Sequence, residues 1–350
     1  MFGLITSGVL LYSYTVFYTD TKPSTDDQTT SSIRAVYPAS RIEVVNLKTY
    51  WRNEIEALGA KTAYAAFKAH YSNLDIGGKH EVAHYFGGVL YETVGLSGIS
   101  TCDEDFSYGC FHEFITFALY DSGPSILEEL DFFCKNSEFD CQHGIGHGLL
   151  AVAGYDAPDL IEALDTCQKL GTVDKSDGCF GGIFMEYNLR TMWGKDAEIR
   201  PLSTTTSDEI CYSIPTYAQQ ACFFWSAQWY MALAQGSNRS AQIERAQSQC
   251  ATLQTLDEQL QCINGLGYEI GSYETNPPTA IDLCTKPDEQ ESVLHYQQCV
   301  IATLAGLNGS PLNREAVRET CYTQKAVPIA TCLNVLGTQD RKRIGIITDY

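Results

Sequence analysis

The sequence predicts an all-α protein, an α-solenoid of about eight helical hairpins, seven of them closed by a disulfide. Two observations support this fold class. The fourteen cysteines form seven close pairs, and the second cysteine of each pair recurs every 31 to 43 residues, a period that indicates helical repeats. No run of alternating apolar and polar residues predicts strands instead. The pairs are Cys102–Cys110, Cys134–Cys141, Cys167–Cys179, Cys211–Cys222, Cys250–Cys262, Cys284–Cys299 and Cys321–Cys332.

Each cysteine pair is flanked by two kinds of segment that predict one hairpin. A short amphipathic run such as APDLIEALDTC, opened by a proline or a small polar residue, ends at the first cysteine. A longer apolar run rich in Gly, Ala and aromatics, such as CQHGIGHGLLAVAG, follows the second cysteine. A disulfide between the two would contribute roughly 2–3 kcal/mol per hairpin. Glycines inside the second helix weaken it, and they therefore predict close helix packing.

The cysteine count also predicts the compartment. An even number of cysteines without any CxxC pair favours disulfides in an oxidising environment over zinc ribbons or thioredoxin-like redox sites. The net charge of −20 argues against a nucleic-acid partner, because phosphate binding needs a basic face. We therefore expect an extracytoplasmic protein with a soluble acidic surface.

The two ends of the chain differ from the repeats. Residues 2–18 carry no charge, and their length lies between that of a signal peptide core and that of a membrane span. We expect an uncleaved anchor that places the protein at the cell surface, with a cleaved signal peptide and secretion as the alternative. The expected layout is a signal or membrane-anchor segment at 1–18, a flexible linker at 19–45, a helical-repeat domain at 46–338 and a C-terminal tail at 339–350. Residues 46–97 form an opening hairpin without cysteines, in which Gly78 takes the place of the second cysteine.

The repeat pattern over residues 46–338 resembles the TPR and Sel1-like helical repeats, including cysteine-rich secreted versions with one disulfide per repeat. This resemblance implies stacked hairpins. The sequence leaves open a protein partner or self-assembly through the repeat surface. The resemblance is one of architecture alone. The tetratricopeptide consensus is not legible in this chain, so no ligand-binding residue carries over.

Histidines occur in register with this repeat. Counted from each second cysteine, or from Gly78 in the opening hairpin, five of the seven histidines lie two or six residues further along in three consecutive repeats. Positions four apart share one helix face, and equivalent helices of stacked repeats present that face to the same side. Three carboxylates lie next to these positions, namely Glu81, Glu113 and Glu186. The histidines are His80, His84, His112, His143 and His147.

This register predicts a transition-metal site. Two histidines four apart on a helix can chelate one ion, and nitrogen ligands with added carboxylates suit zinc, iron or copper better than calcium. Adjacent helices pack 8–10 Å apart, so the outer two pairs converge over His112 only if the array curves tightly. Otherwise two separate sites form. The alternative is that the histidines only pack, and that the chain is a structural or protein-interaction module without metal.

Two enzyme families resemble parts of this pattern. HEVAH, residues 80–84, resembles the HExxH motif of zinc metallopeptidases, but Leu90 stands where metzincins have their third histidine. His80-Glu81 and His112-Glu113 resemble the pairs of deoxyhypusine hydroxylase, an α-solenoid that holds two irons. Here a glycine follows His143, the fourth repeat has no histidine, and the disulfides are foreign to that family. Neither activity transfers, and the chain could be a metalloenzyme, such as an oxidase or oxygenase, or a metal store.

Overall fold

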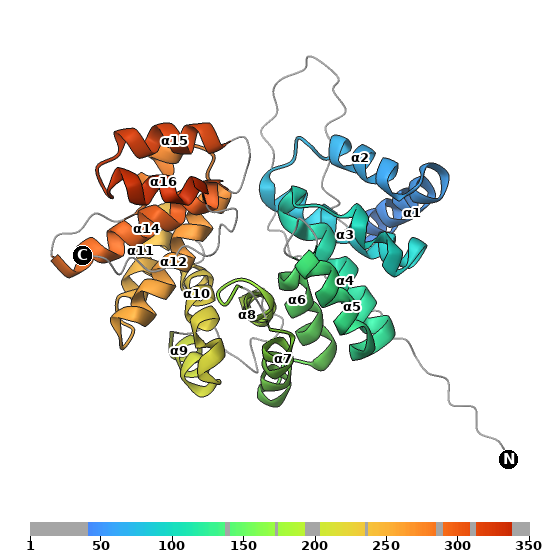
Figure 1. Cartoon of the computed structure of the whole chain (residues 1–350), viewed down its shortest axis with the longest axis horizontal. Helices are drawn as coiled ribbons and strands as arrows, with labels where there is room; N and C mark the ends of the chain where they lie inside the picture. The colour runs from blue at the N-terminus through green and yellow to red at the C-terminus, as the bar shows by residue number, and fades with distance from the viewer. Residues whose placement is uncertain are drawn as a thin grey trace.

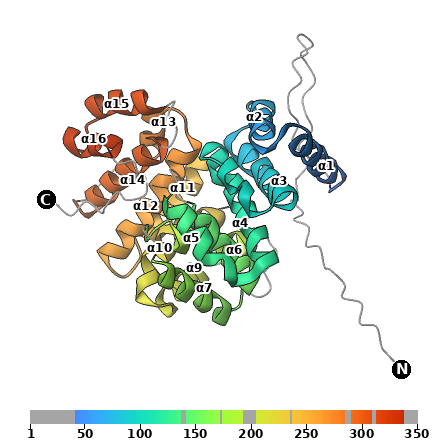
Figure 2. The same cartoon turned by 45° about the vertical axis from the view of Figure 1, so that its right-hand side comes forward.

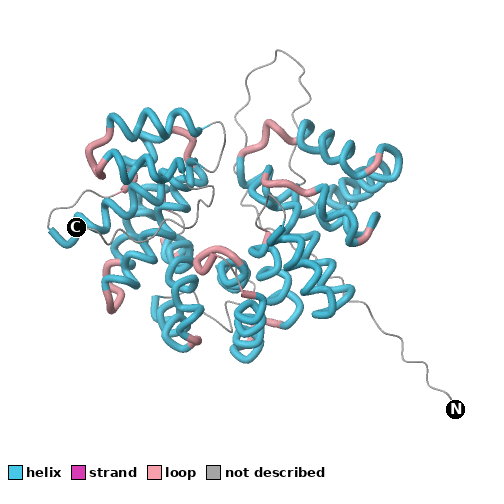
Figure 3. The backbone as a smooth tube through the Cα atoms, in the orientation of Figure 1, coloured by secondary structure: helices cyan, strands magenta, loops and turns pink. Residues whose placement is uncertain are grey.

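The computed structural model describes residues 41–136, 141–171, 174–192, 204–234, 237–284, 290–308 and 313–337. Helices dominate these ranges and no strand occurs in them, which confirms the all-α class (Figure 3). The expected segment 1–18, most of the linker 19–45, and the tail 339–350 lie outside the described residues. The first described helix begins at Arg41, within the range expected for the linker.

Helices of 6 to 19 residues make up most of the described chain. None of the described helices is long and apolar enough to cross a membrane. In chain order the elements are α1 (Arg41–Leu58), α2 (Ala60–His70), α3 (Ile76–Val94), η1 (Leu96–Thr101), η2 (Asp105–Tyr108), α4 (Gly109–Ser122), η3 (Gly123–Ile126), α5 (Leu127–Asn136), α6 (Gln142–Ala153), α7 (Ala157–Leu170), α8 (Cys179–Met192), α9 (Thr204–Ser213), α10 (Thr216–Ala232), α11 (Arg239–Cys250), α12 (Leu256–Tyr273), α13 (Pro277–Asp282), α14 (Gln290–Asn308), α15 (Arg314–Thr323) and α16 (Ile329–Gly337).

Eight of the described helices form one continuous row, which we call the inner row. It consists of α3, α4, α6, α8, α10, α12, α14 and α16, and each of these helices packs against the next. The helices between them pack against one or two members of the row. Figure 1 shows the chain following an arc in sequence order, from α1–α3 through α6–α8 to α14–α16, and Figure 2 shows the same order from another side. Consecutive repeats therefore contact one another through the inner row.

The fourteen cysteines form seven disulfides, and the partners are those expected from the sequence. Their Cα–Cα distances of 5.0–5.9 Å are ordinary for disulfides. In six of the seven, the first cysteine lies in or directly after the short helix and the second lies in or directly before the inner-row helix. In the remaining one, Cys102 follows the 3₁₀ turn η1. Each disulfide therefore ties one inner-row helix, or the residue directly before it, to the segment that precedes it.

Glycines bring the inner helices into backbone contact. A Cβ atom on Gly87 of α3 would lie 2.1 Å from the carbonyl oxygen of Cys110 in α4. A Cβ atom on Gly182 of α8 would lie 1.9 Å from the carbonyl oxygen of His143 in α6. No side chain fits at such distances, so only glycine permits these helix pairs. The close approach brings the side chains of neighbouring inner helices together.

The opening unit contains three helices where the sequence predicts a hairpin. Helices α1 and α2 pack on α3 through rings, with centroids 5.2 Å apart for Trp51 and Phe67 and 4.7 Å apart for Phe67 and Phe86. Asp75 caps α3 by accepting a hydrogen bond from the Gly78 amide at 2.7 Å. Gly78 thus lies in the first turn of α3, as Cys110 does in α4 and Cys179 in α8.

Candidate metal centre

The five predicted histidines lie together. His80 and His84 come from α3, His112 from α4, and His143 and His147 from α6. The ring of His112 lies 4.8–5.2 Å from each of the other four rings, measured between centroids. The helices α3, α4 and α6 are therefore arranged so that the two outer histidine pairs meet over His112.

Two groups of three histidines could each hold a metal ion. His80, His84 and His112 form the first, and His112, His143 and His147 form the second. Within each group, one ring nitrogen of every histidine lies within 4.8 Å of the others. His112 belongs to both groups.

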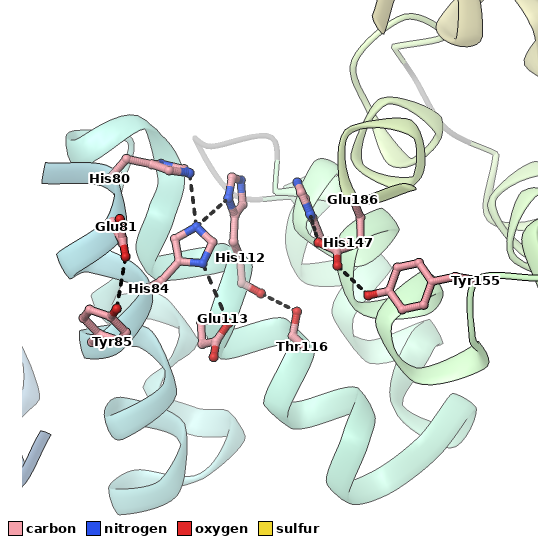
Figure 4. Close-up of polar contacts among 10 residues, drawn as sticks. All are labelled: His80, Glu81, His84, Tyr85, His112, Glu113, Thr116, His147, Tyr155 and Glu186. Atoms are coloured by element: carbon pink, nitrogen blue, oxygen red, sulfur yellow. Dashed lines mark hydrogen bonds and ion pairs between the residues drawn. The ribbon is translucent and has the colours of Figure 1, made fainter. Parts of the chain in front are cut away.

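The first pair is His80 and His84, whose Nε2 atoms lie 3.1 Å apart (Figure 4). The Nδ1 atom of His80 lies 3.2 Å from the carbonyl oxygen of Phe106. That carbonyl belongs to the turn before α4, in which Phe106, Ser107 and Tyr108 all have positive φ. The Nδ1 atom of His84 lies 3.7 Å from a carboxylate oxygen of Glu113. This pair is thus supported from α4 and its preceding turn.

The second pair, His143 and His147, has the same arrangement one repeat further on. Their Nε2 atoms also lie 3.1 Å apart. The Nδ1 atom of His143 lies 2.6 Å from the carbonyl oxygen and 2.8 Å from a carboxylate oxygen of Asp177. The Nδ1 atom of His147 lies 3.1 Å from Glu186, which also accepts a hydrogen bond from Tyr155 at 2.5 Å (Figure 4). This pair is supported from α8 and the turn before it.

These contacts determine the tautomers of the second pair. A carbonyl or an ionised carboxylate can only accept, so the Nδ1 atoms of His143 and His147 both donate and both carry hydrogen. When both rings are neutral, each Nε2 atom presents a lone pair to the other at 3.1 Å. Two lone pairs facing each other repel unless a cation lies between or beside them. Histidines that ligate metals have this arrangement, with the second ring nitrogen bound to a carboxylate or carbonyl.

The surroundings favour neutral histidines next to ionised carboxylates. Burial and, to a smaller extent, the neighbouring His84 together lower the pKa of His80 to about 3. Burial also lowers the pKa of His112 and of His147 below the ordinary histidine value. Burial alone would raise the pKa of Glu186, but its hydrogen bonds to His147 and Tyr155 outweigh this, so its pKa is lowered. These three histidines are therefore neutral, as a metal ligand must be, and Glu186 supplies negative charge.

The two pairs differ in exposure. His143 and His147 retain only 7% and 5% of their surface, whereas the side chain of His84 is 29% exposed. Trp225 of α10 covers the second pair, with its ring 5.6 Å from that of His143, and it donates from Nε1 to the carbonyl of Ser176 at 3.0 Å. The second group is enclosed, and the first is open on the His84 side.

We compared the chain with known proteins. No family model, curated protein or solved structure matches the chain. The resemblance to TPR and Sel1-like repeats stays a prediction. The site must be judged from its own residues.

The three predicted carboxylates have different places. Glu113 and Glu186 both face the Nδ1 atoms of cluster histidines. Glu81 accepts a hydrogen bond from the hydroxyl of Tyr85 at 3.1 Å, beside the cluster (Figure 4). The HExxH spacing thus brings its two histidines together and directs its glutamate to a tyrosine.

Four contributors lie outside the sequence prediction. They are Asp177, the carbonyl of Phe106, Tyr155 and Trp225. Asp177 lies two residues before Cys179, and its acidic side chain was a signal available in the sequence. No sequence signal marks the Phe106 carbonyl, because every residue has a backbone carbonyl. Tyr155 and Trp225 reach the site through folding alone.

Proposed function

We propose that this protein is a secreted or surface-anchored α-solenoid of about eight hairpins, stapled by disulfides, that binds a transition metal through His80, His84, His112, His143 and His147. One observation carries the metal assignment. His143 and His147 have their Nδ1 atoms committed to Asp177 and Glu186, and their Nε2 lone pairs face each other at 3.1 Å. Packing alone gives no reason to hold two acceptors this way in a buried place.

Ligand chemistry narrows the metal to zinc, iron or copper. The inward atoms are neutral imidazole nitrogens, which these ions prefer and calcium or magnesium do not. Glu113, Asp177 and Glu186 orient the rings through Nδ1 and offset the charge of a cation. The continuous inner row supports the solenoid, and the seven disulfides support an oxidising compartment.

Elemental analysis of the purified full-length protein tests the proposal. The protein is stripped of metal, incubated with excess Zn²⁺ at neutral pH and desalted. We expect bound zinc in the wild type, a clear loss in the double variant His143→Ala/His147→Ala, and wild-type content in His70→Ala. His70 is an exposed histidine outside the cluster and serves as the matched control.

Two results would overturn the proposal. Wild-type protein that binds none of Zn²⁺, Fe²⁺ and Cu²⁺ would make the histidines structural, and the interaction-module alternative would then stand. A double variant with wild-type metal content would place the metal elsewhere. Circular dichroism of the double variant checks that the helices persist.

A further inference from the structure

We infer that the cluster holds two metal ions rather than one, and that His112 bridges them through both nitrogens of its ring. This inference rests on the metal binding proposed above. The two ions belong to two half-sites. The first half-site is the pair His80 and His84, and the second is the pair His143 and His147.

The two half-sites are separate. Each has its own histidine pair and its own oxygen acceptors, and each shares only His112 with the other. Each pair lies on one inner helix, with its own Nε2–Nε2 distance of 3.1 Å. Each has its own oxygen acceptors from the following inner helix and the turn before it. The same construction occurs twice along the repeat, so each copy should chelate its own ion.

A single ion does not reach both pairs. The pairs come from α3 and α6, and α4 packs between these helices. Among the five rings, the close contacts run within a pair or between a pair and His112. His112 is therefore the link between two centres.

The ring of His112 contacts both half-sites. Its Nδ1 atom lies 3.4 Å from Nε2 of His84, on the side of the first pair. A nitrogen of the same ring also lies within 4.8 Å of ligand atoms of His143 and His147. A ring that ligates two ions must give up its N–H proton, which leaves to water as the second ion binds, and the ring becomes an imidazolate. Zn–N bonds of about 2.0–2.1 Å on both sides would place the ions roughly 6 Å apart.

The charge of the surroundings fits two divalent cations. Glu113 and Glu186 each contact a histidine of one pair, and Asp177 contacts His143. Together with an imidazolate at His112, these three carboxylates balance the charge of two divalent ions. A single divalent ion would leave an excess of negative charge in a largely buried place, which is unfavourable.

Copper loading followed by electron paramagnetic resonance tests the bridge. The metal-free full-length protein is titrated with Cu²⁺, and bound copper is counted by elemental analysis. We expect two copper ions per chain. Two Cu²⁺ ions joined by an imidazolate couple antiferromagnetically, so the integrated signal should be far below two spins per chain at full loading. At low loading, chains that hold one ion should give one full spin each.

Two variants sharpen the test. In His112→Ala the bridge is absent, so any copper that remains bound should give one full spin per ion. His70→Ala should behave like the wild type, because its side chain lies outside the cluster. The wild-type spin count decides the question even if His112→Ala fails to fold.

The outcomes separate this inference from the proposed function. One copper per chain in the wild type would leave metal binding in place and overturn the two-ion centre. Two coppers with two full spins would mean independent sites and would overturn the bridge. A wild type that binds no copper, iron or zinc would overturn both the inference and the proposed function.

Discussion

A histidine that ligates a metal differs from one that only packs in the hydrogen bond made by its other ring nitrogen. In the second pair, both Nδ1 atoms donate to oxygens of Asp177 or Glu186, which leaves both Nε2 atoms as bare acceptors. Two histidines that only pack would not need both Nδ1 atoms held by acceptors in this way. The orienting carboxylates are therefore expected to matter for affinity, although they do not touch the metal in this arrangement.

Glu186→Gln should weaken metal binding without unfolding the protein. Glutamine keeps the shape but loses the charge that holds His147 in its Nδ1–H tautomer, and the loss of such a support typically costs about 10–100-fold in metal affinity. Competition with a chromophoric chelator measures the affinity. Glu128→Gln, on an exposed position of α5, is the control and should bind as the wild type does. Equal affinity in Glu186→Gln would show that Glu186 does not support the site.

The environment of a second glutamate, Glu269, should affect how the stability of the protein depends on pH. Burial raises the pKa of its carboxyl, and the hydrogen bond from Gln228 and the charge of Arg239 only partly oppose this. The folded state thus holds the proton more tightly than the unfolded chain, whose glutamate pKa is about 4.3. The folded protein consequently loses stability as pH rises from that value through the raised pKa.

Glu269→Gln should therefore stabilise the protein at neutral pH. The neutral amide can still accept the hydrogen bond from Gln228, and it does not bury a charge. Denaturant unfolding from pH 3.5 to 8, an interval chosen around the unfolded pKa of about 4.3, measures the effect. The variant and the wild type should be alike at the acid end, and the advantage of the variant should grow as pH rises. A constant difference, or a less stable variant at pH 7, would contradict this account.

At the scale of helices, glycine contacts set how the inner row is packed. Gly87 and Gly182 let α3 meet α4, and α6 meet α8, through backbone atoms. His143 itself provides the carbonyl that Gly182 contacts. The spacing of these helices therefore controls where the histidines and their supports lie.

Gly182→Ala should destabilise the protein and weaken its metal site. The new Cβ would lie 1.9 Å from the His143 carbonyl, so α6 and α8 must separate, at a cost of about 1–3 kcal/mol or more. Gly77→Ala is the matched control, since its Cβ would meet nothing closer than 3.6 Å. Chemical denaturation and chelator competition measure the two effects. If both variants behave as the wild type does, the helices tolerate a side chain at this contact.

At the scale of the whole molecule, the disulfides lie at different distances from the histidine cluster. The disulfide Cys102–Cys110 spans the turn whose Phe106 carbonyl supports His80. The disulfide Cys321–Cys332 lies at the far end of the row, between α15 and α16. The two disulfides close similar loops, with separations of 8 and 11 residues.

Removing these disulfides should have different consequences. Cys102→Ser/Cys110→Ser and Cys321→Ser/Cys332→Ser should each lower the free energy of unfolding by about 2–3 kcal/mol. Only the first should also weaken metal binding, because it frees the turn beside His80. Thermal unfolding and chelator competition on both variants give the two quantities. Equal metal affinity in the two variants would mean that the turn keeps its place without its disulfide.

The sequence by itself determined the helical class, the cysteine partners and the register of the histidines. Each of these depends on short spacings along one chain. Cysteines 7 to 15 residues apart pair across a single turn, and His143 and His147 share a helix face because they are four residues apart.

Only the tertiary structure decided that the two histidine pairs meet over His112, and which oxygens hold their Nδ1 atoms. That meeting depends on how α3, α4 and α6 pack on one another, and the backbone contact at Gly87 is part of that packing. The support from Asp177, Tyr155 and the Phe106 carbonyl comes from repeats further along the chain. A spacing rule cannot place such groups, because their distance to the histidines is set by how helices pack and not by how many residues separate them.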